Sequence, residues 1–122
     1  MNGKRPLRAR LRSEGGGPDR TDGEAAAKKK SRWHVYLSGE VQHVGLRYTA
    51  LYLCRRLKLT GWVKNLPDGR VELEIQGDVS KLRQFYMLLK SQPPIRITHA
   101  DIGEIPLVRG ERGFSISRLE LL

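Results

Sequence analysis

Hydrophobic residues after position 32 recur with a period of two in some segments and with a helical period in others. Alternation of apolar and polar residues is typical of half-buried strands, whereas apolar residues three and four positions apart are typical of amphipathic helices. Alternation predicts strands at 33–38, 62–66, 71–76, 98–107 and 114–117. Helical spacing occurs in two sets of residues: Ala50, Leu53, Cys54 and Leu57, and Leu82, Phe85, Tyr86 and Leu89. The predicted order is therefore strand, helix, strand, strand, helix, strand, followed by a short fifth strand.

Residues that favour turns and helix ends separate these segments. The sequence Pro-Asp-Gly at 67–69 supplies a tight turn, because proline presets one φ angle and glycine accepts a positive one. This turn predicts a hairpin between the second and third strands. Asp78 is a good N-cap for the second helix, and two prolines at 93 and 94 end that helix.

Two amphipathic helices bury their apolar stripes when they pack together on one face of a sheet. The sequence therefore predicts an α+β, ferredoxin-like sandwich, with two helices on one face of a mostly antiparallel sheet. This fold serves many unrelated functions, so the function has to be argued from the site.

The first 32 residues differ in composition from the rest of the chain. They contain ten Lys/Arg and four Asp/Glu, a net charge of +6 out of +10, and no periodic apolar pattern. Such a segment buries too little apolar surface to offset the entropy of ordering it. We therefore expect a disordered basic extension at 1–32 and one folded domain at 33–122.

Composition also excludes several classes of protein. No apolar stretch is long enough to span a bilayer, and residues 1–12 are basic instead of apolar, unlike a signal peptide. The single cysteine indicates a reducing compartment, so we expect a cytoplasmic protein. The histidines lack metal-ligand spacing. No strand carries the aromatic run of RNA-binding sheets, so nucleic acid is expected at most to bind the extension nonspecifically.

The segment 39–47 runs from the end of a predicted strand, through a loop, into a helix. The start of a helix presents unpaired N–H groups and a partial positive charge, which together bind phosphate. Arg47 lies in or near the first helical turn and could donate two charge-assisted hydrogen bonds to phosphate oxygens. By itself this pattern is ordinary, because such an arginine is commonly a solvated surface residue.

The segment 61–71 places Asn65 near the end of a strand, just before the predicted turn. An isolated asparagine in this position usually supports the turn. Its amide also offers both a donor and an acceptor, which is what holding a water molecule beside an anionic substrate requires.

Taken together, the two segments resemble the signatures of the acylphosphatase family. The first family signature is Gly-x-Val-Gln-Gly-Val-x-(Phe or Met)-Arg, and residues 39–47 match it with two departures. The second is Gly-aromatic-x-x-Asn-x-x-x-Gly-x-Val, and residues 61–71 match it without a break. The likeness extends over about residues 33–117.

The resemblance implies an enzyme that hydrolyses small acyl phosphates, with no metal, cofactor or membrane partner. We expect it to act as a monomer. The phosphate would lie in the loop formed by Gln42, His43, Val44, Gly45, Leu46 and Arg47. The guanidinium of Arg47 would bind the phosphate, and Asn65 would hold the attacking water. An acyl phosphate has a good leaving group, so positioning and charge stabilisation supply most of the catalysis.

Two residues of the loop depart from the family signature. Leu46 replaces an aromatic residue, which is a change of packing. His43 replaces a glycine that would allow a positive φ angle and close approach to the phosphate. One alternative therefore stays open, a phosphate-binding module whose catalysis His43 has impaired. A second alternative is an RNA-binding domain of the same fold, assisted by the basic extension.

Overall fold

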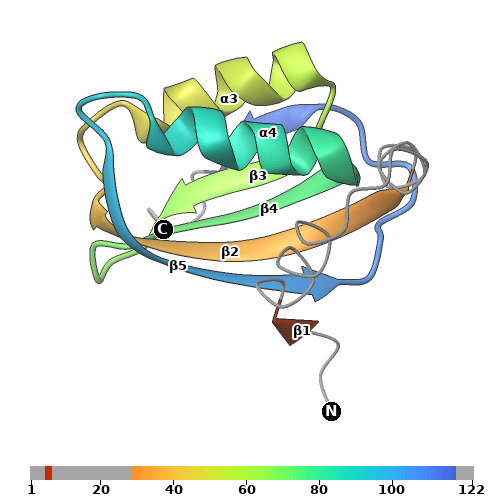
Figure 1. The fold of residues 1–122 in the computed structure, drawn as a ribbon, viewed down its shortest axis with the longest axis horizontal. Coiled ribbons are helices and arrows are strands. Elements are labelled where there is room, and N and C mark those ends of the chain that lie inside the picture. Colours follow the sequence, from red (N-terminus) through yellow and green to blue (C-terminus); the bar gives the residue numbers. More distant parts are fainter. Residues whose placement is uncertain (1–4, 7–28, 118–122) are drawn as a thin grey trace, which may run out of the picture.

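The computed structural model describes residues 5–6 and 29–117 as two helices on one face of a sheet (Figure 1). The elements are β1 (Arg5–Pro6), β2 (Lys30–Glu40), α3 (Leu46–Leu57), β3 (Thr60–Asn65), β4 (Val71–Asp78), α4 (Val79–Lys90), β5 (Arg96–Ile105) and β6 (Phe114–Ile116). The predicted order of strands and helices and the ferredoxin-like class are confirmed.

The strands form one sheet in the order β1-β5-β2-β4-β3-β6. All neighbouring strands are antiparallel except β3 and β6, which are parallel. The hairpin of β3 and β4 forms as predicted, with Asn65 opposite Val71. The sheet is therefore mixed, and β3 lies between its hairpin partner and the last strand.

The core lies between the sheet and the two helices. Alternate residues of the central strands point toward the helices and are almost completely buried: Trp33, Val35 and Leu37 of β2, and Val71, Leu73 and Ile75 of β4. They pack against the buried stripes of the helices: Leu46, Ala50, Leu53 and Cys54 of α3, and Leu82, Phe85 and Leu89 of α4. Burying each large side chain contributes about 1.5–3 kcal/mol, so this layer supplies most of the stability.

The opposite face of the sheet, hereafter the open face, carries polar side chains from the alternate positions of the same strands. Arg32 is only 2% exposed, and its guanidinium donates to Glu74 at 2.8 Å, to Gln76 at 3.1 Å and to Glu111 at 2.7 Å. His34 Nε2 lies 2.7 Å from a carboxylate oxygen of Glu72. Because Glu111 belongs to the segment between β5 and β6, Arg32 ties that segment to the open face.

Several strand boundaries differ from prediction: β3 begins at Thr60 instead of 62, β4 runs to Asp78 instead of 76, and β2 and β5 are also shifted. β2 begins at Lys30, before the predicted boundary at 33, because Ser31 and Arg32 are buried and hydrogen-bonded. β5 spans Arg96–Ile105, two residues earlier than predicted, and ends just before Pro106, whose nitrogen cannot donate a hydrogen bond. Arg5–Pro6 pair with β5. The rest of the predicted disordered extension, 1–4 and 7–28, lies outside the described residues.

Neither α3 nor α4 has the length and hydropathy that a membrane-crossing helix needs.

Candidate active site

The loop between β2 and α3 presents unpaired backbone N–H groups. Gly45 is the N-cap of α3, with φ of 82°, and no side chain caps the helix. The first hydrogen bond of the helix runs from the N–H of Thr49 to the carbonyl oxygen of Gly45, at 3.0 Å. The N–H groups of Leu46 and Arg47 come before the first hydrogen bond of the helix and have no partner within α3, so this end of the helix can bind an anion.

His43 adopts the left-handed conformation, with φ of 62°. This is the region that glycine enters freely and that costs other residues about 1 kcal/mol. The backbone of the loop thus has a shape suited to glycine although a histidine occupies it. The imidazole itself is exposed.

Gln42 joins the loop to the β3–β4 hairpin. Its amide nitrogen donates to the backbone oxygens of Leu66 at 2.8 Å and of Arg70 at 2.9 Å. Both N–H groups of the amide are therefore used in holding two loops together. The sequence motif predicts Gln42 only as part of the backbone of the phosphate loop, since nothing in the local pattern indicates where its amide reaches.

The turn of the hairpin is closed by short hydrogen bonds. The N–H of Leu66 donates to Arg70 at 2.8 Å, and the N–H of Gly69 donates to Leu66 at 3.1 Å. The carboxylate of Asp68 accepts from the backbone N–H of Arg70 at 3.1 Å and from its side-chain Nε at 2.8 Å. The hydrogen bond from the Arg70 backbone lowers the pKa of Asp68. The hairpin therefore forms a fixed support beside Asn65.

Asn65 is the last residue of β3, and it has an unsatisfied polar atom. Its Oδ1 is buried and has no hydrogen-bond partner within the described part of the chain. Leaving a buried acceptor unpaired costs about 1–3 kcal/mol. A buried atom of this kind calls for a donor from outside the protein, such as a water molecule or a ligand.

Arg47 is half-buried in the first turn of α3, and α3 is in contact with β3. Its guanidinium makes no hydrogen bond or ion pair with any residue in the described ranges. A positive charge in the first turn of a helix is disfavoured by the helix dipole. A bound anion would remove that conflict and would use both the guanidinium and the free N–H groups.

The remaining candidate residues of the loop pack in or against the hydrophobic core. Leu46 is 1% exposed and belongs to the core, so the leucine in place of an aromatic residue is a packing difference. Val44 is half-buried against the core. Cys54 lies on the buried side of α3, where burial raises the pKa of its thiol, so it is a packing residue. No cluster of three or more metal-ligating side chains occurs among residues 29–117.

The first glycine of each motif allows strands to approach closely. Gly39 has φ of 123°, and a Cβ there would collide with the backbone oxygen of Arg96. Gly61 has φ of 138°, and a Cβ there would collide with the backbone oxygen of Glu74. Both glycines are therefore required by the sheet that positions the loop and the hairpin.

Fold and site together define a small ferredoxin-like domain with an anion-binding loop next to an unpaired strand-end amide. The family model described as Acylphosphatase matches residues 33–116. The chain belongs to the acylphosphatase family. The expected enzyme class, a hydrolase of this family, is thereby confirmed.

Several relatives carry the same name over most of their length. The acylphosphatase of Pediococcus pentosaceus is 46% identical over 80 residues, which cover 64% of this chain and 89% of the relative. That of Trichormus variabilis is 39% identical over 88 residues, covering 72% of this chain and 87% of the relative.

Solved structures agree with this assignment. The crystal structure of acylphosphatase from Bacillus subtilis matches with a TM-score of 0.68 and 33% identity, covering 74% of this chain and all of the other. A full-length HypF structure shares the fold, with a TM-score of 0.67 at 23% identity, over 12% of its length.

Proposed function

We propose that this chain hydrolyses the carboxyl–phosphate bond of acyl phosphates, with loop 42–47 and Arg47 binding the phosphate and Asn65 holding the attacking water. The observation that carries this proposal is the unpaired, buried Oδ1 of Asn65. Gln42 ties the strand end that bears this atom to the loop with the free N–H groups.

The free N–H groups at the start of α3 and the guanidinium of Arg47 match the needs of a phosphate. Charge accumulates on the phosphoryl oxygens in the transition state, and donors that are already oriented stabilise it without reorganisation. Within the described ranges, Arg47 has no hydrogen bond or ion pair that must break before a phosphate can bind. It is therefore available for two parallel hydrogen bonds to phosphate oxygens.

The water would donate one hydrogen bond to Asn65 Oδ1 and attack phosphorus with its oxygen. The bond between phosphorus and the bridging oxygen breaks, and the carboxylate leaves with the bonding electrons. A proton of the water passes to a phosphate oxygen, so the products are a carboxylate and inorganic phosphate. Holding the water in line with the leaving group is the main contribution asked of Asn65.

A second candidate function rests on His43. Its left-handed backbone, with φ of 62°, keeps the loop shape but puts a side chain where the family has glycine. A Cβ at this point could narrow the space for a phosphate. In that case the domain would bind phosphate without turning over acyl phosphates.

Hydrolysis of a simple aromatic acyl phosphate separates the two candidates. Wild type, Arg47→Ala and His43→Gly are compared, with Arg55→Ala as the matched control, an exposed arginine on the same helix. Turnover by wild type and Arg55→Ala, and its loss in Arg47→Ala, supports the enzyme. Turnover only after His43→Gly supports the impaired module. Silence in all four folded proteins contradicts the proposal.

For the cellular setting, we place the protein in the cytoplasm as a monomer acting on a small-molecule acyl phosphate. The support is the single buried cysteine, which needs no oxidising compartment. Light scattering at increasing concentration tests the monomer, and a mass that rises to that of a dimer contradicts it.

A further inference from the structure

Charge is unevenly divided between the helices and the rest of the domain. α3 and α4, hereafter the helix layer, contain basic residues and no acidic one: Arg47, Arg55, Arg56, Lys81, Arg83 and Lys90. The acidic residues among 29–117 lie in strands, turns and loops: Glu40, Asp68, Glu72, Glu74, Asp78, Asp101, Glu104 and Glu111. The helix layer is therefore strongly basic, independently of the basic N-terminal segment.

Helix stability explains only part of this distribution. Arg55 and Arg56 lie in the last turn of α3, and Lys90 in the last turn of α4, where the helix dipole favours cations. Lys81 lies in the first turn of α4, which has no acidic residue, so the dipole disfavours it. The proposed phosphate site accounts for Arg47 but not for Lys81. An anionic partner on the outer side of the helices would account for the excess.

Exposed aromatic rings accompany the basic residues. Tyr48 is 58% exposed and Tyr52, one turn later on α3, is 57% exposed. The guanidinium of Arg56 lies 5.6 Å from the centre of the Tyr52 ring, and its Nη1 donates to the Tyr52 hydroxyl at 2.9 Å. This ring is therefore held in place beside a cation. Exposed rings next to cations are the surface on which nucleobases stack.

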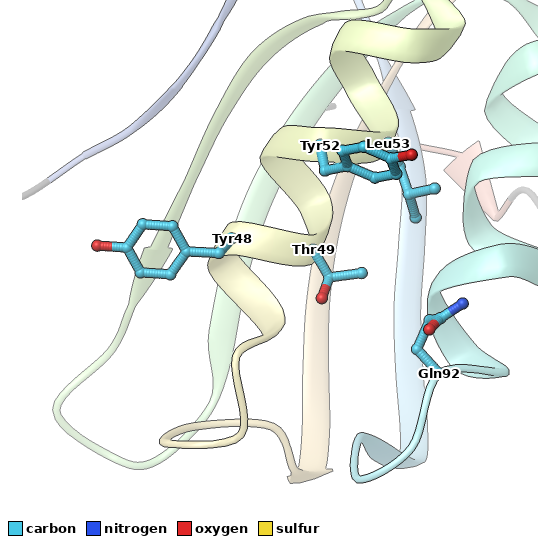
Figure 2. Close-up of a pocket in the computed structure, with 5 residues that line it drawn as sticks. All are labelled: Tyr48, Thr49, Tyr52, Leu53 and Gln92. Atoms are coloured by element: carbon cyan, nitrogen blue, oxygen red, sulfur yellow. The ribbon is translucent and has the colours of Figure 1, made fainter.

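A pocket of about 300 Å³ lies beside this ring, lined by Tyr48, Thr49, Tyr52, Leu53 and Gln92. Figure 2 shows Thr49 and Leu53 on the side of α3 that faces Gln92, whereas the ring of Tyr48 extends away from it. Leu53 gives the pocket an apolar wall, and Thr49 and Gln92 give it a hydroxyl and an amide. A flat apolar group with polar edges, such as a nucleobase, fits this lining.

The basic residues lie toward both ends of the helix layer. α3 and α4 run side by side in opposite directions, so the last turn of α3 lies near the first turn of α4 (Figure 1). Arg55 and Arg56 thus belong to the same end of the helix layer as Lys81. Lys90 ends α4 two residues before Gln92, which lines the pocket, and its Nζ lies 5.2 Å from the centre of the Tyr86 ring. A chain of phosphates crossing the helix layer would meet cations before and after the pocket.

We propose that the helix layer binds single-stranded nucleic acid, with a base stacked on Tyr52 in the pocket and phosphates on Arg55, Arg56, Lys81 and Lys90. An acidic protein or an anionic bilayer would use the charges but would leave the ring and the amide of the pocket without a role. The sequence pattern predicts nucleic acid at most at the basic extension, so this site would be an additional one. The proposal does not depend on acyl phosphate hydrolysis, because none of these four cations, nor Tyr52, belongs to the proposed active site.

Fluorescence anisotropy of a labelled 12-nucleotide oligouridylate with the full chain tests the stacking. Tyr52→Ala keeps every charge, including those of residues 1–32, and is expected to weaken binding about 5-fold or more, the range for losing one stacked base. Tyr52→Phe keeps the ring and should bind like wild type. Met87→Ala removes another exposed side chain, 58% exposed and outside the pocket, and should also bind like wild type. Equal affinity of Tyr52→Ala and wild type overturns the proposal.

Charge reversal tests the phosphate contacts. Arg55→Glu with Lys81→Glu should weaken binding and reduce the slope of log affinity against log salt, because each lost phosphate contact removes about 0.7 from it. Lys64→Glu, with the reversed charge on the open face, is the matched control and should keep the slope. An unchanged slope in the double variant overturns the proposal. So does polyglutamate or an anionic phospholipid vesicle that competes as well as unlabelled oligouridylate.

Discussion

Polar atoms are buried both on the open face of the sheet and at the hairpin end beside the loop between β2 and α3. The two regions differ in whether these atoms have hydrogen-bond partners. Arg32, on the open face, is 2% exposed and is paired with Glu74, Gln76 and Glu111. Asn65, at the hairpin end, has a buried oxygen without a partner in the described part of the chain. A buried charge is tolerated when its partners are present, and removing one member of such a set is strongly destabilising. A buried acceptor left unpaired lowers the stability of the fold, but it is available to bind a water molecule or a ligand during a reaction.

The largest effect that this comparison predicts is on the open face. Arg32→Ala should lower the free energy of unfolding by about 3–5 kcal/mol, because it leaves carboxylates near the buried site without their cation. Arg32→Met, which fills the space, should lower it less. Chemical denaturation measures both. Turnover of the folded fraction should be unchanged, and a loss of activity beyond the loss of folded protein would break the division of roles.

The next effect is at the hairpin end. Asn65→Ala should lower kcat about 100-fold or more, the size seen when an oriented catalytic hydrogen-bonding group is removed. It should leave phosphate affinity, measured by competitive inhibition, within about 2-fold, a change of only about 0.4 kcal/mol. Stability should not fall, because the substitution removes an unpaired atom. Equal losses of rate and phosphate affinity would contradict the assignment of Asn65 to the water.

A smaller effect is expected from the strained residue of the loop. His43→Gly should raise the free energy of unfolding by about 1 kcal/mol or less, since glycine adopts the left-handed region without strain but gains entropy when unfolded. Thermal denaturation measures it. His99→Gly, an exposed histidine in β5, should instead be destabilising. A loss of stability in His43→Gly would show that its side chain makes contacts that outweigh the strain.

The smallest effect concerns acid. Burial raises the pKa of Glu111, but hydrogen bonds from Arg32 and Thr60 and the charge of Arg32 outweigh it, so the net pKa is lowered. A lowered pKa in the folded state stabilises the protein above the unfolded pKa of about 4.3. That contribution, below about 1 kcal/mol for a partly exposed ion pair, is lost as the pH falls through the folded pKa. Wild type should therefore lose stability more steeply than Glu111→Gln as the pH falls below about 5. Parallel profiles would contradict the pairing.

Local patterns predicted much of this molecule. The alternation in β2 and β4, the helical spacing at Ala50 and Leu53, and the Pro-Asp-Gly turn each depend on neighbouring residues, and each gave the right element. The candidate site came from two motifs whose order and spacing are visible in the chain. Their catalytic roles stay predictions.

What could not be predicted depends on residues far apart in sequence. The partners of Arg32 are 42, 44 and 79 positions away, so its burial and the early start of β2 are not visible locally. The amide of Gln42 reaches carbonyls 24 and 28 positions away. The unpaired oxygen of Asn65 is likewise a property of everything around it, and no motif records the absence of a partner.

The two hydrogen bonds of Gln42 also decide what a protein engineer could transplant. The loop between β2 and α3 is short and continuous, which suggests that it could be grafted alone. However, the side-chain amide of Gln42 in this loop is hydrogen-bonded to the backbone of Leu66 and Arg70. Grafted alone onto another sheet–helix scaffold, it would lose that anchor and its fixed distance from Asn65. The smallest portable unit is a discontinuous pair of segments, 39–47 and 61–71, carried together with the strand spacing that their glycines permit.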